Sequence, residues 1–143
     1  MHVFAEFKGL RGIYDNHAGC ERGYFRKPDN DVIVLPKRDS NGMELALPDL
    51  VLHDPSDKTI LIIEGKKHNK LADGLNALEQ YGPIENEYIC PHYPSCKVER
   101  WVTLYGGNLN TVPEEKVLLL VNKKGNLILN DNAPNCIKRI FEI

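Results

Sequence analysis

The sequence lacks most of the features that would place a chain outside ordinary globular proteins. Its 143 residues include four cysteines and one tryptophan. No apolar run approaches the roughly 20 residues that a membrane-spanning helix requires. The first eight residues do not show the charged and then apolar segments of a signal peptide. We therefore expect one domain over residues 1–143, in the cytoplasm and without membrane contact, as a minimal enzyme or as the core of a larger one.

An excess of charge of one sign is also missing. The chain has 18 lysines and arginines against 20 aspartates and glutamates, which gives a net charge of −2. This balance argues against a uniformly basic protein that coats DNA. It leaves room for a local basic patch, because carboxylates that bind a metal ion lower the total.

The few cysteines allow two interpretations. Cys90 and Cys96 bracket His92, while His17 and Cys20 form a similar pair upstream. Four of these side chains could hold a structural Zn²⁺, although no Cys-x₂-Cys pair is present. The alternative is a loop rich in tyrosine and proline whose thiols stay reduced, as is usual in the cytoplasm.

The most informative segment runs from Leu47 to Lys67. Two apolar strands, Leu47–Leu52 and Thr59–Glu64, are joined by the turn-forming residues 53–58. The second strand is apolar at four consecutive positions, as expected for a strand buried on both faces. It then ends in the polar residues Glu64-Gly65-Lys66-Lys67.

Strand geometry predicts a cluster at this end. Side chains alternate across a strand, so Glu64 and Lys66 point to the same face, and an antiparallel hairpin brings Asp49 opposite them. Two adjacent carboxylates repel each other, and Mg²⁺ relieves that repulsion with the oxygen ligands that it prefers. The alternative is an edge hairpin in which these three residues form an ordinary surface salt bridge.

Pro48-Asp49 followed by Glu64-Gly65-Lys66 resembles the PD-(D/E)XK nuclease superfamily, and within it the type II restriction endonucleases. The resemblance covers roughly residues 31–107. It implies an α/β fold with an αβββαβ core and a mixed central sheet. It also implies Mg²⁺-dependent hydrolysis of double-stranded DNA by a homodimer, with Mn²⁺ able to replace Mg²⁺.

The resemblance also implies residue roles. Asp49, Glu64 and the backbone carbonyl of Gly65 would hold the metal ion. Lys66 would orient the attacking water.

Further residues were assigned around this cluster. Lys67, Lys70 and Gln80 are predicted to contact nucleic acid. Glu6, Glu21 and Glu44 are alternatives for an additional acid at the metal site. Glu44 lies five residues before Asp49, on the opposite face by strand parity unless a bulge intervenes.

Periodicity predicts the remaining elements. The expected order is a helical turn over residues 3–10, a first core strand over 31–36, a second over 45–52, a helix over 69–81, a strand over 98–105, a strand and hairpin arm over 117–121 and 127–129, and a closing helix over 134–143. Asn41-Gly42 marks the turn between the first two core strands.

Three other functions remain compatible with the sequence. The same fold could resolve Holliday junctions, nick DNA or act in repair. It could be a non-catalytic module that binds DNA. It could also be an interaction domain stabilised by Zn²⁺ through residues 17, 20, 90, 92 and 96.

Overall fold

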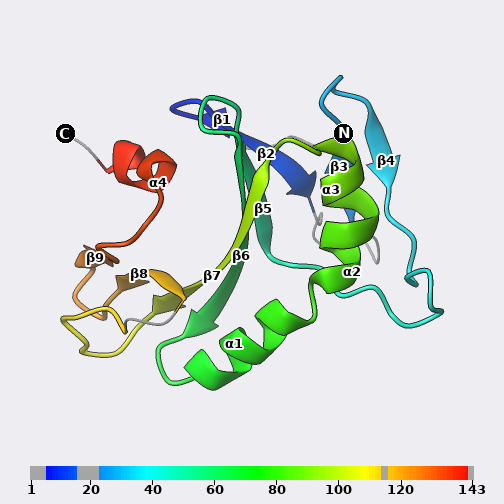
Figure 1. The fold of residues 1–143 in the computed structure, drawn as a ribbon. Coiled ribbons are helices and arrows are strands. Elements are labelled where there is room, and N and C mark those ends of the chain that lie inside the picture. Colours follow the sequence, from blue (N-terminus) through cyan, green and yellow to red (C-terminus); the bar gives the residue numbers. More distant parts are fainter. Residues whose placement is uncertain (1–5, 16–22, 114–115, 142–143) are drawn as a thin grey trace.

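The computed structural model describes residues 6–15, 23–113 and 116–141, with only the backbone for residues 6 and 7. These residues form a mixed α/β fold, in which one long, twisted sheet separates a run of helices from a single C-terminal helix (Figure 1). No helix among them is long and apolar enough to cross a membrane.

Nine strands of the described residues form the sheet, in the order β4-β3-β2-β5-β6-β7-β8-β9 with β1 beside β2. The strands are β1 (Glu6–Phe7), β2 (Leu10–Asp15), β3 (Tyr24–Arg26), β4 (Val32–Val34), β5 (Leu50–Asp54), β6 (Thr59–Lys67), β7 (Lys97–Tyr105), β8 (Val117–Val121) and β9 (Leu127–Leu129). The β6–β7 and β7–β8 pairs are parallel, and the other pairs are antiparallel.

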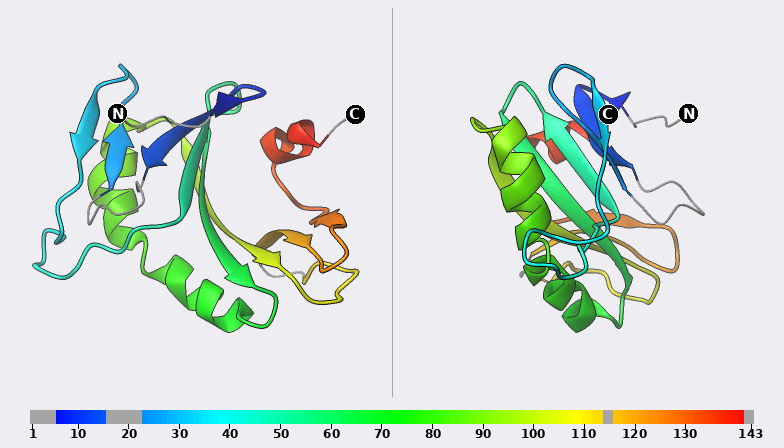
Figure 2. Two further views of the ribbon diagram at one scale, coloured as in Figure 1. Left: turned by 180° about the vertical axis from the view of Figure 1, so that it is seen from behind. Right: turned by 90° about the vertical axis from the view of Figure 1, so that its right-hand side faces the viewer.

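Strand β6 is the centre of the fold. Residues 59–64 are all buried, because the sheet is covered on both faces at this point (Figure 2). One apolar core packs Ile60, Ile62 and Val102 against the helical run, and the other packs Leu61 and Trp101 against the C-terminal helix. The β-branched and aromatic residues of β6 and β7 suit this two-sided burial.

The helical run begins directly after β6. It consists of α1 (Leu71–Glu79), α2 (Gly82–Ile84), a π-helical segment (Glu85–Ile89) and α3 (Cys90–His92). The C-terminal helix is α4 (Asn135–Ile140), which buries Cys136 and Ile137. The helices predicted over 69–81 and 134–143 are therefore confirmed with shorter bounds. The strands predicted over 117–121 and 127–129 are confirmed with the same bounds, and the strand over 98–105 begins one residue earlier, at Lys97.

The predicted N-terminal helical turn is wrong where the structure describes it. Residues 6–15 form the hairpin β1–β2, and residues 1–5 lie outside the described part of the chain. Lys8 and Gly9 have φ values of 48° and 87°, which suit a two-residue hairpin turn and exclude a continuous helix. Leu10 then packs in one core and Ile13 in the other.

The first core strand is also not where the sequence predicted it. Val32–Val34 forms β4 at the sheet edge, with Val32 and Val34 about half exposed, and β2 instead pairs with β5. The second strand begins at Leu50 rather than Leu45. Arg38 and Glu44 form only an isolated bridge around the Asn41-Gly42 turn. Pairing partners far along the chain decided this arrangement, and local periodicity does not encode them.

A loop over residues 87–96 was one of the two interpretations of the segment around Cys90 and Cys96, and it is wrong for most of the segment. Helical structure continues through His92, since Pro83 and Pro91 each lie in the first turn of a short helix, where a missing N–H costs nothing. The helical run and the residue that follows it place Ile84, Ile89 and Tyr93 in the core beneath the sheet.

Candidate active site at the end of strand β6

Asp49 and Glu64 are brought together by the register of β5 and β6. Leu50 pairs with Ile63, so the next residues outward on the two chains are Asp49 and Glu64. The Gly65 N–H donates a hydrogen bond of 2.8 Å to Asp49 Oδ2, which fixes the Asp49 side chain although it is exposed. The predicted pairing of the two carboxylates is thus present.

Glu64 is buried, with 8% of its surface exposed. The Tyr81 hydroxyl donates a hydrogen bond of 2.7 Å to Glu64 Oε1. On the other side, Lys66 Nζ lies 3.6 Å from Glu64 Oε2. Glu64 thus lies between a hydroxyl donor and Lys66, which is the cation beside it on the face that alternation predicted.

The environment favours the neutral form of Glu64. Burial raises the pKa of this carboxyl, and Asp49 raises it further by repulsion and by sharing a hydrogen bond with it. The Tyr81 hydroxyl and the Lys66 ammonium act in the opposite direction and do not fully offset these effects. Burial combined with a like charge is the pattern that a bound cation would relieve.

A second tyrosine faces the same carboxylates. Tyr14, on β2, is almost fully buried, and among the described residues its hydroxyl has no hydrogen-bond partner. Burial raises the pKa of Tyr14, and the negative charges of Asp49, Asp15 and Glu64 contribute. A Cβ at Gly23 would overlap the Tyr14 ring, so Gly23 leaves the space that the ring fills.

An open pocket of about 440 Å³ leads to Glu64. It lies between the C-terminal end of α1 and the segment that precedes β5. Its lining residues are Met43, Glu44, Ala46, Leu47, Glu64, Ala77, Gln80 and Tyr81. Glu44 and Gln80, which were predicted as an additional acid and a nucleic-acid contact, therefore both face this pocket.

Gly65 lies on the side of β6 that Asp49 occupies. Its N–H points to Asp49, and the N–H and C=O of one strand residue lie on the same side of the strand. The Gly65 carbonyl therefore also faces this side, beyond the last β5–β6 pair. A Cβ at residue 65 would lie 3.6 Å from both Asp49 Oδ2 and Thr103 Oγ1.

The donor set fits a hard divalent cation. Glu64 lines an open pocket, Asp49 is exposed, and the Gly65 carbonyl faces the Asp49 side of β6. Carboxylate and carbonyl oxygens are the ligands that Mg²⁺ selects, with water filling its other positions. Burial and the charge of Asp49 raise the pKa of Glu64, and Lys66 offsets only part of this effect. The described residues contain no group of three or more His, Cys, Asp or Glu side chains that could hold a metal ion. A magnesium site would therefore depend on the Gly65 carbonyl and on water.

Three other predicted residues lie farther from Glu64. Lys67 is exposed and points to the opposite face from Glu64 and Lys66. Lys70 is exposed just before α1. Glu6 lies in β1, and successive strand pairs connect its position to Arg11, His53 and Ile60 across the sheet. Ile60 is four residues before Glu64 on β6, which corresponds to about 13 Å at 3.3 Å per residue.

The described cysteines do not form a zinc cluster. Cys90 is exposed, whereas Cys96 Sγ lies 3.6 Å from His53 Nε2. The His92 ring packs 5.8 Å from the Phe25 ring, centroid to centroid. His17, Cys20 and Glu21 lie outside the described residues, so the predictions for them remain predictions.

Sequence reasoning missed Tyr14 and Tyr81 as residues of the site. Tyr81 was interpreted as a core or rim aromatic, and nothing local shows that its hydroxyl reaches Glu64, 17 residues away. Tyr14 lies on a strand that the sequence analysis did not predict. No protein-family model, curated protein or solved structure matched the chain.

Proposed function

We propose that the chain is a Mg²⁺-dependent DNA endonuclease of the PD-(D/E)XK type, most simply a type II restriction endonuclease. The observation that carries this proposal is the cluster at the end of β6. Asp49 and Glu64 face each other across the β5–β6 pair, and Lys66 Nζ lies 3.6 Å from Glu64. Acid, acid and amine are the groups that hydrolysis of a phosphodiester requires beside a metal ion.

The order of strands and helices along the chain also supports the proposed nuclease function. Strands β2, β5 and β6 are antiparallel neighbours, α1 follows, and β7 returns parallel to β6. This order is compatible with the βββαβ part of the core that the resemblance implies, with β2 in place of the first core strand predicted over 31–36. The described residues contain no helix before β2, so they do not include the leading helix of the implied core.

Each residue of the cluster would have a separate role in cleavage. Asp49, Glu64 and the Gly65 carbonyl would hold Mg²⁺, which supplies Lewis acidity when bound. Lys66 would donate a hydrogen bond to the attacking water and orient it, and its positive charge would stabilise the negative charge that develops on the phosphate. Tyr81 keeps Glu64 oriented through its hydrogen bond. Gln80, at the mouth of the pocket, would contact the DNA.

The proposal includes a cytoplasmic homodimer that cuts both strands of duplex DNA, one strand for each site. Resolution of branched DNA or nicking by the same residues is the neighbouring function. Duplex, branched and single-stranded substrates compared side by side would separate these activities.

Plasmid cleavage in Mg²⁺ tests the proposal. Wild type is expected to cut, while Asp49→Ala and Lys66→Ala lose at least about 10²-fold in rate, the usual contribution of a positioned catalytic group. Lys97→Ala is the matched control, because Lys97 is an exposed lysine at the other end of the paired strand. Circular dichroism should show the same fold in all four proteins. Equal cutting by all four, or cutting by none, would overturn the proposal.

A further inference from the structure

Three loops meet where β6, β7 and β8 end. Lys67 pairs with Tyr105, and Tyr105 pairs with Val121 across the two parallel interfaces. The His68 N–H donates to the Tyr105 carbonyl at 2.8 Å, and the Lys123 N–H donates to the Gly107 carbonyl at 2.7 Å. Residues 66–70, 105–110 and 122–126 thus form one continuous strand-end surface.

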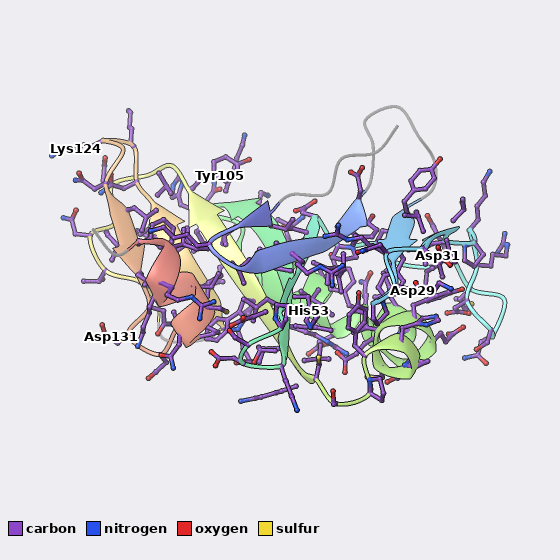
Figure 3. The ribbon with its side chains drawn as sticks, turned by 90° about the horizontal axis from the view of Figure 1, so that it is seen from above. Asp29, Asp31, His53, Tyr105, Lys124 and Asp131 are labelled. Carbon is purple, nitrogen blue, oxygen red and sulfur yellow. The ribbon has the colours of Figure 1, made fainter. Side chains whose placement is uncertain are left out.

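The strand-end surface is strongly basic, although the whole chain is slightly acidic. Its three segments contain five lysines and no aspartate or glutamate, whereas the whole chain has a net charge of −2. The lysines are Lys66, Lys67, Lys70, Lys123 and Lys124, and all but Lys66 are exposed. Figure 3 shows Tyr105 and Lys124 along one edge of the molecule and Asp131 away from it. Mere solvation of a surface does not require such segregation of charge.

The other residues of the surface suit a phosphate backbone. Tyr105 is 51% exposed, although it is a large aromatic residue at the end of a core strand. Gly106 and Gly107 have φ values of 85° and 71°, and a Cβ at Gly107 would lie 2.6 Å from the His68 ring, so the glycines let the turn pack beneath this imidazole at the surface. Asn108, Asn110, Asn122 and Lys124 line a hollow of about 180 Å³ with amide and amine groups.

The surface also continues from the candidate active site. Glu64 and Lys67 are three residues apart, about 10 Å along the strand. Lys66 and Lys67 point to opposite faces of the sheet. An extended ligand that crosses the end of β6 would therefore pass from the candidate active site to Lys67 and Tyr105. In open α/β sheets, ligands bind outside the carboxyl ends of the strands, which is where these loops lie.

We propose that the strand-end surface binds the phosphodiester backbone of the DNA on which the active site acts. Lys67, Lys123 and Lys124 neutralise phosphates, and Tyr105 packs against a sugar or base beside them. The proposal rests on the proposed function for the identity of the ligand. It adds a binding surface formed by β7 and β8, which the motif at the end of β6 does not include.

Fluorescence anisotropy of a labelled DNA duplex, without divalent metal, tests this surface apart from catalysis. Lys123→Gln with Lys124→Gln should weaken binding and lower the slope of log K against log salt by about 2, one for each phosphate contact. Lys58→Gln with Lys97→Gln is the matched control, since both lysines are exposed at the opposite ends of β6 and β7. Tyr105→Ser should weaken binding with the salt slope unchanged.

The outcomes separate the two proposals. Equal binding by the two double variants overturns the strand-end surface, whatever the result of plasmid cleavage. Loss of binding confined to Lys123→Gln with Lys124→Gln supports the surface even if no variant, wild type included, cuts DNA. Binding of phosphatidylserine vesicles without binding of DNA would overturn the proposal and identify a surface for anionic lipid.

Discussion

Glu64 is the residue at which stability and proposed function conflict. It is buried beside Asp49, and both features raise its pKa above the ordinary value of a glutamate. A carboxyl whose pKa is raised by folding stabilises the fold while it is protonated, and this contribution is lost as the pH rises through the folded-state pKa. Because folding raises the pKa of Glu64, ionisation of this carboxyl lowers the stability of the metal-free fold.

Glu64→Gln should consequently stabilise the metal-free protein at pH 7 while abolishing cleavage. Glutamine keeps an acceptor for the Tyr81 hydroxyl and removes the repulsion with Asp49. We expect a gain of about 1 kcal/mol, in the range usual for neutralising a functional site. The gain should disappear in acid, where Glu64 is protonated. Thermal melts at both pH values check this, with Glu44→Gln as the control from the same pocket. A variant less stable than wild type at pH 7 would contradict the argument.

Burial raises the pKa of Glu64, and the hydrogen bond from Tyr81 acts against it. This hydrogen bond favours the carboxylate, so Tyr81→Phe should raise the pKa of Glu64 further. The acid limb of the cleavage–pH profile should then move toward higher pH, because the charged form of Glu64 loses a hydrogen bond. Tyr88→Phe, a change in the same helical run, is the control. An unmoved acid limb would show that Glu64 ionisation does not limit cleavage.

At the scale of elements, helix α1 positions Lys66 through a glycine. A Cβ at Gly74 would lie 3.0 and 3.1 Å from the two Val102 methyl groups and 3.2 Å from Lys66 Cγ. Val102 is fully buried on β7, which pairs with strands on both sides. The glycine therefore allows α1 to pack closely on β6 and β7.

Gly74→Ala should destabilise the protein although alanine is the better helix former. The helix gains about 1 kcal/mol, whereas overpacking against Val102 costs about 1–3 kcal/mol. Displacement of Lys66 should also slow cleavage.

Asn76→Ala, exposed on the same helix, should be neutral or stabilising in denaturant melts. Combining Gly74→Ala with Val102→Ala should cost less than the sum of the single changes. Additive losses of stability would mean that contact with Val102 is not what destabilises Gly74→Ala.

At the scale of the whole molecule, the candidate metal site lies between strands that belong to one sheet. A cation that binds only the folded state raises the free energy of unfolding by mass action, about 1.4 kcal/mol at ten times its dissociation constant. Cation binding can therefore be measured from global unfolding, independently of any DNA substrate.

Millimolar Mg²⁺ should raise the melting temperature of wild type and of Glu79→Gln, which changes an exposed carboxylate on α1. It should have little effect on Asp49→Ala or Glu64→Gln, because each lacks one of the two facing carboxylates. Differential scanning fluorimetry with and without a chelator checks this. An equal shift in all four proteins would indicate general ion binding instead of a site.

The position of the candidate site was predictable because it depends on one hairpin. Alternation along β6 and the short turn after β5 place Asp49, Glu64 and Lys66 together, and the structure brings them together. The strand and helix that follow were also predictable, since the apolar periodicity of residues 69–81 and 98–105 is strong.

Only the tertiary structure decided which strand lies beside β5 and which side chains surround Glu64. Strand β2 is about 40 residues from β5 along the chain, and Tyr14 and Tyr81 reach the carboxylates from separate elements. Such long-range pairings depend on how whole faces are buried, which short-range patterns do not encode. The sequence by itself determined a hairpin with its acids and amine. The buried environment that raises the pKa of Glu64 comes from the packing of the complete sheet and helices.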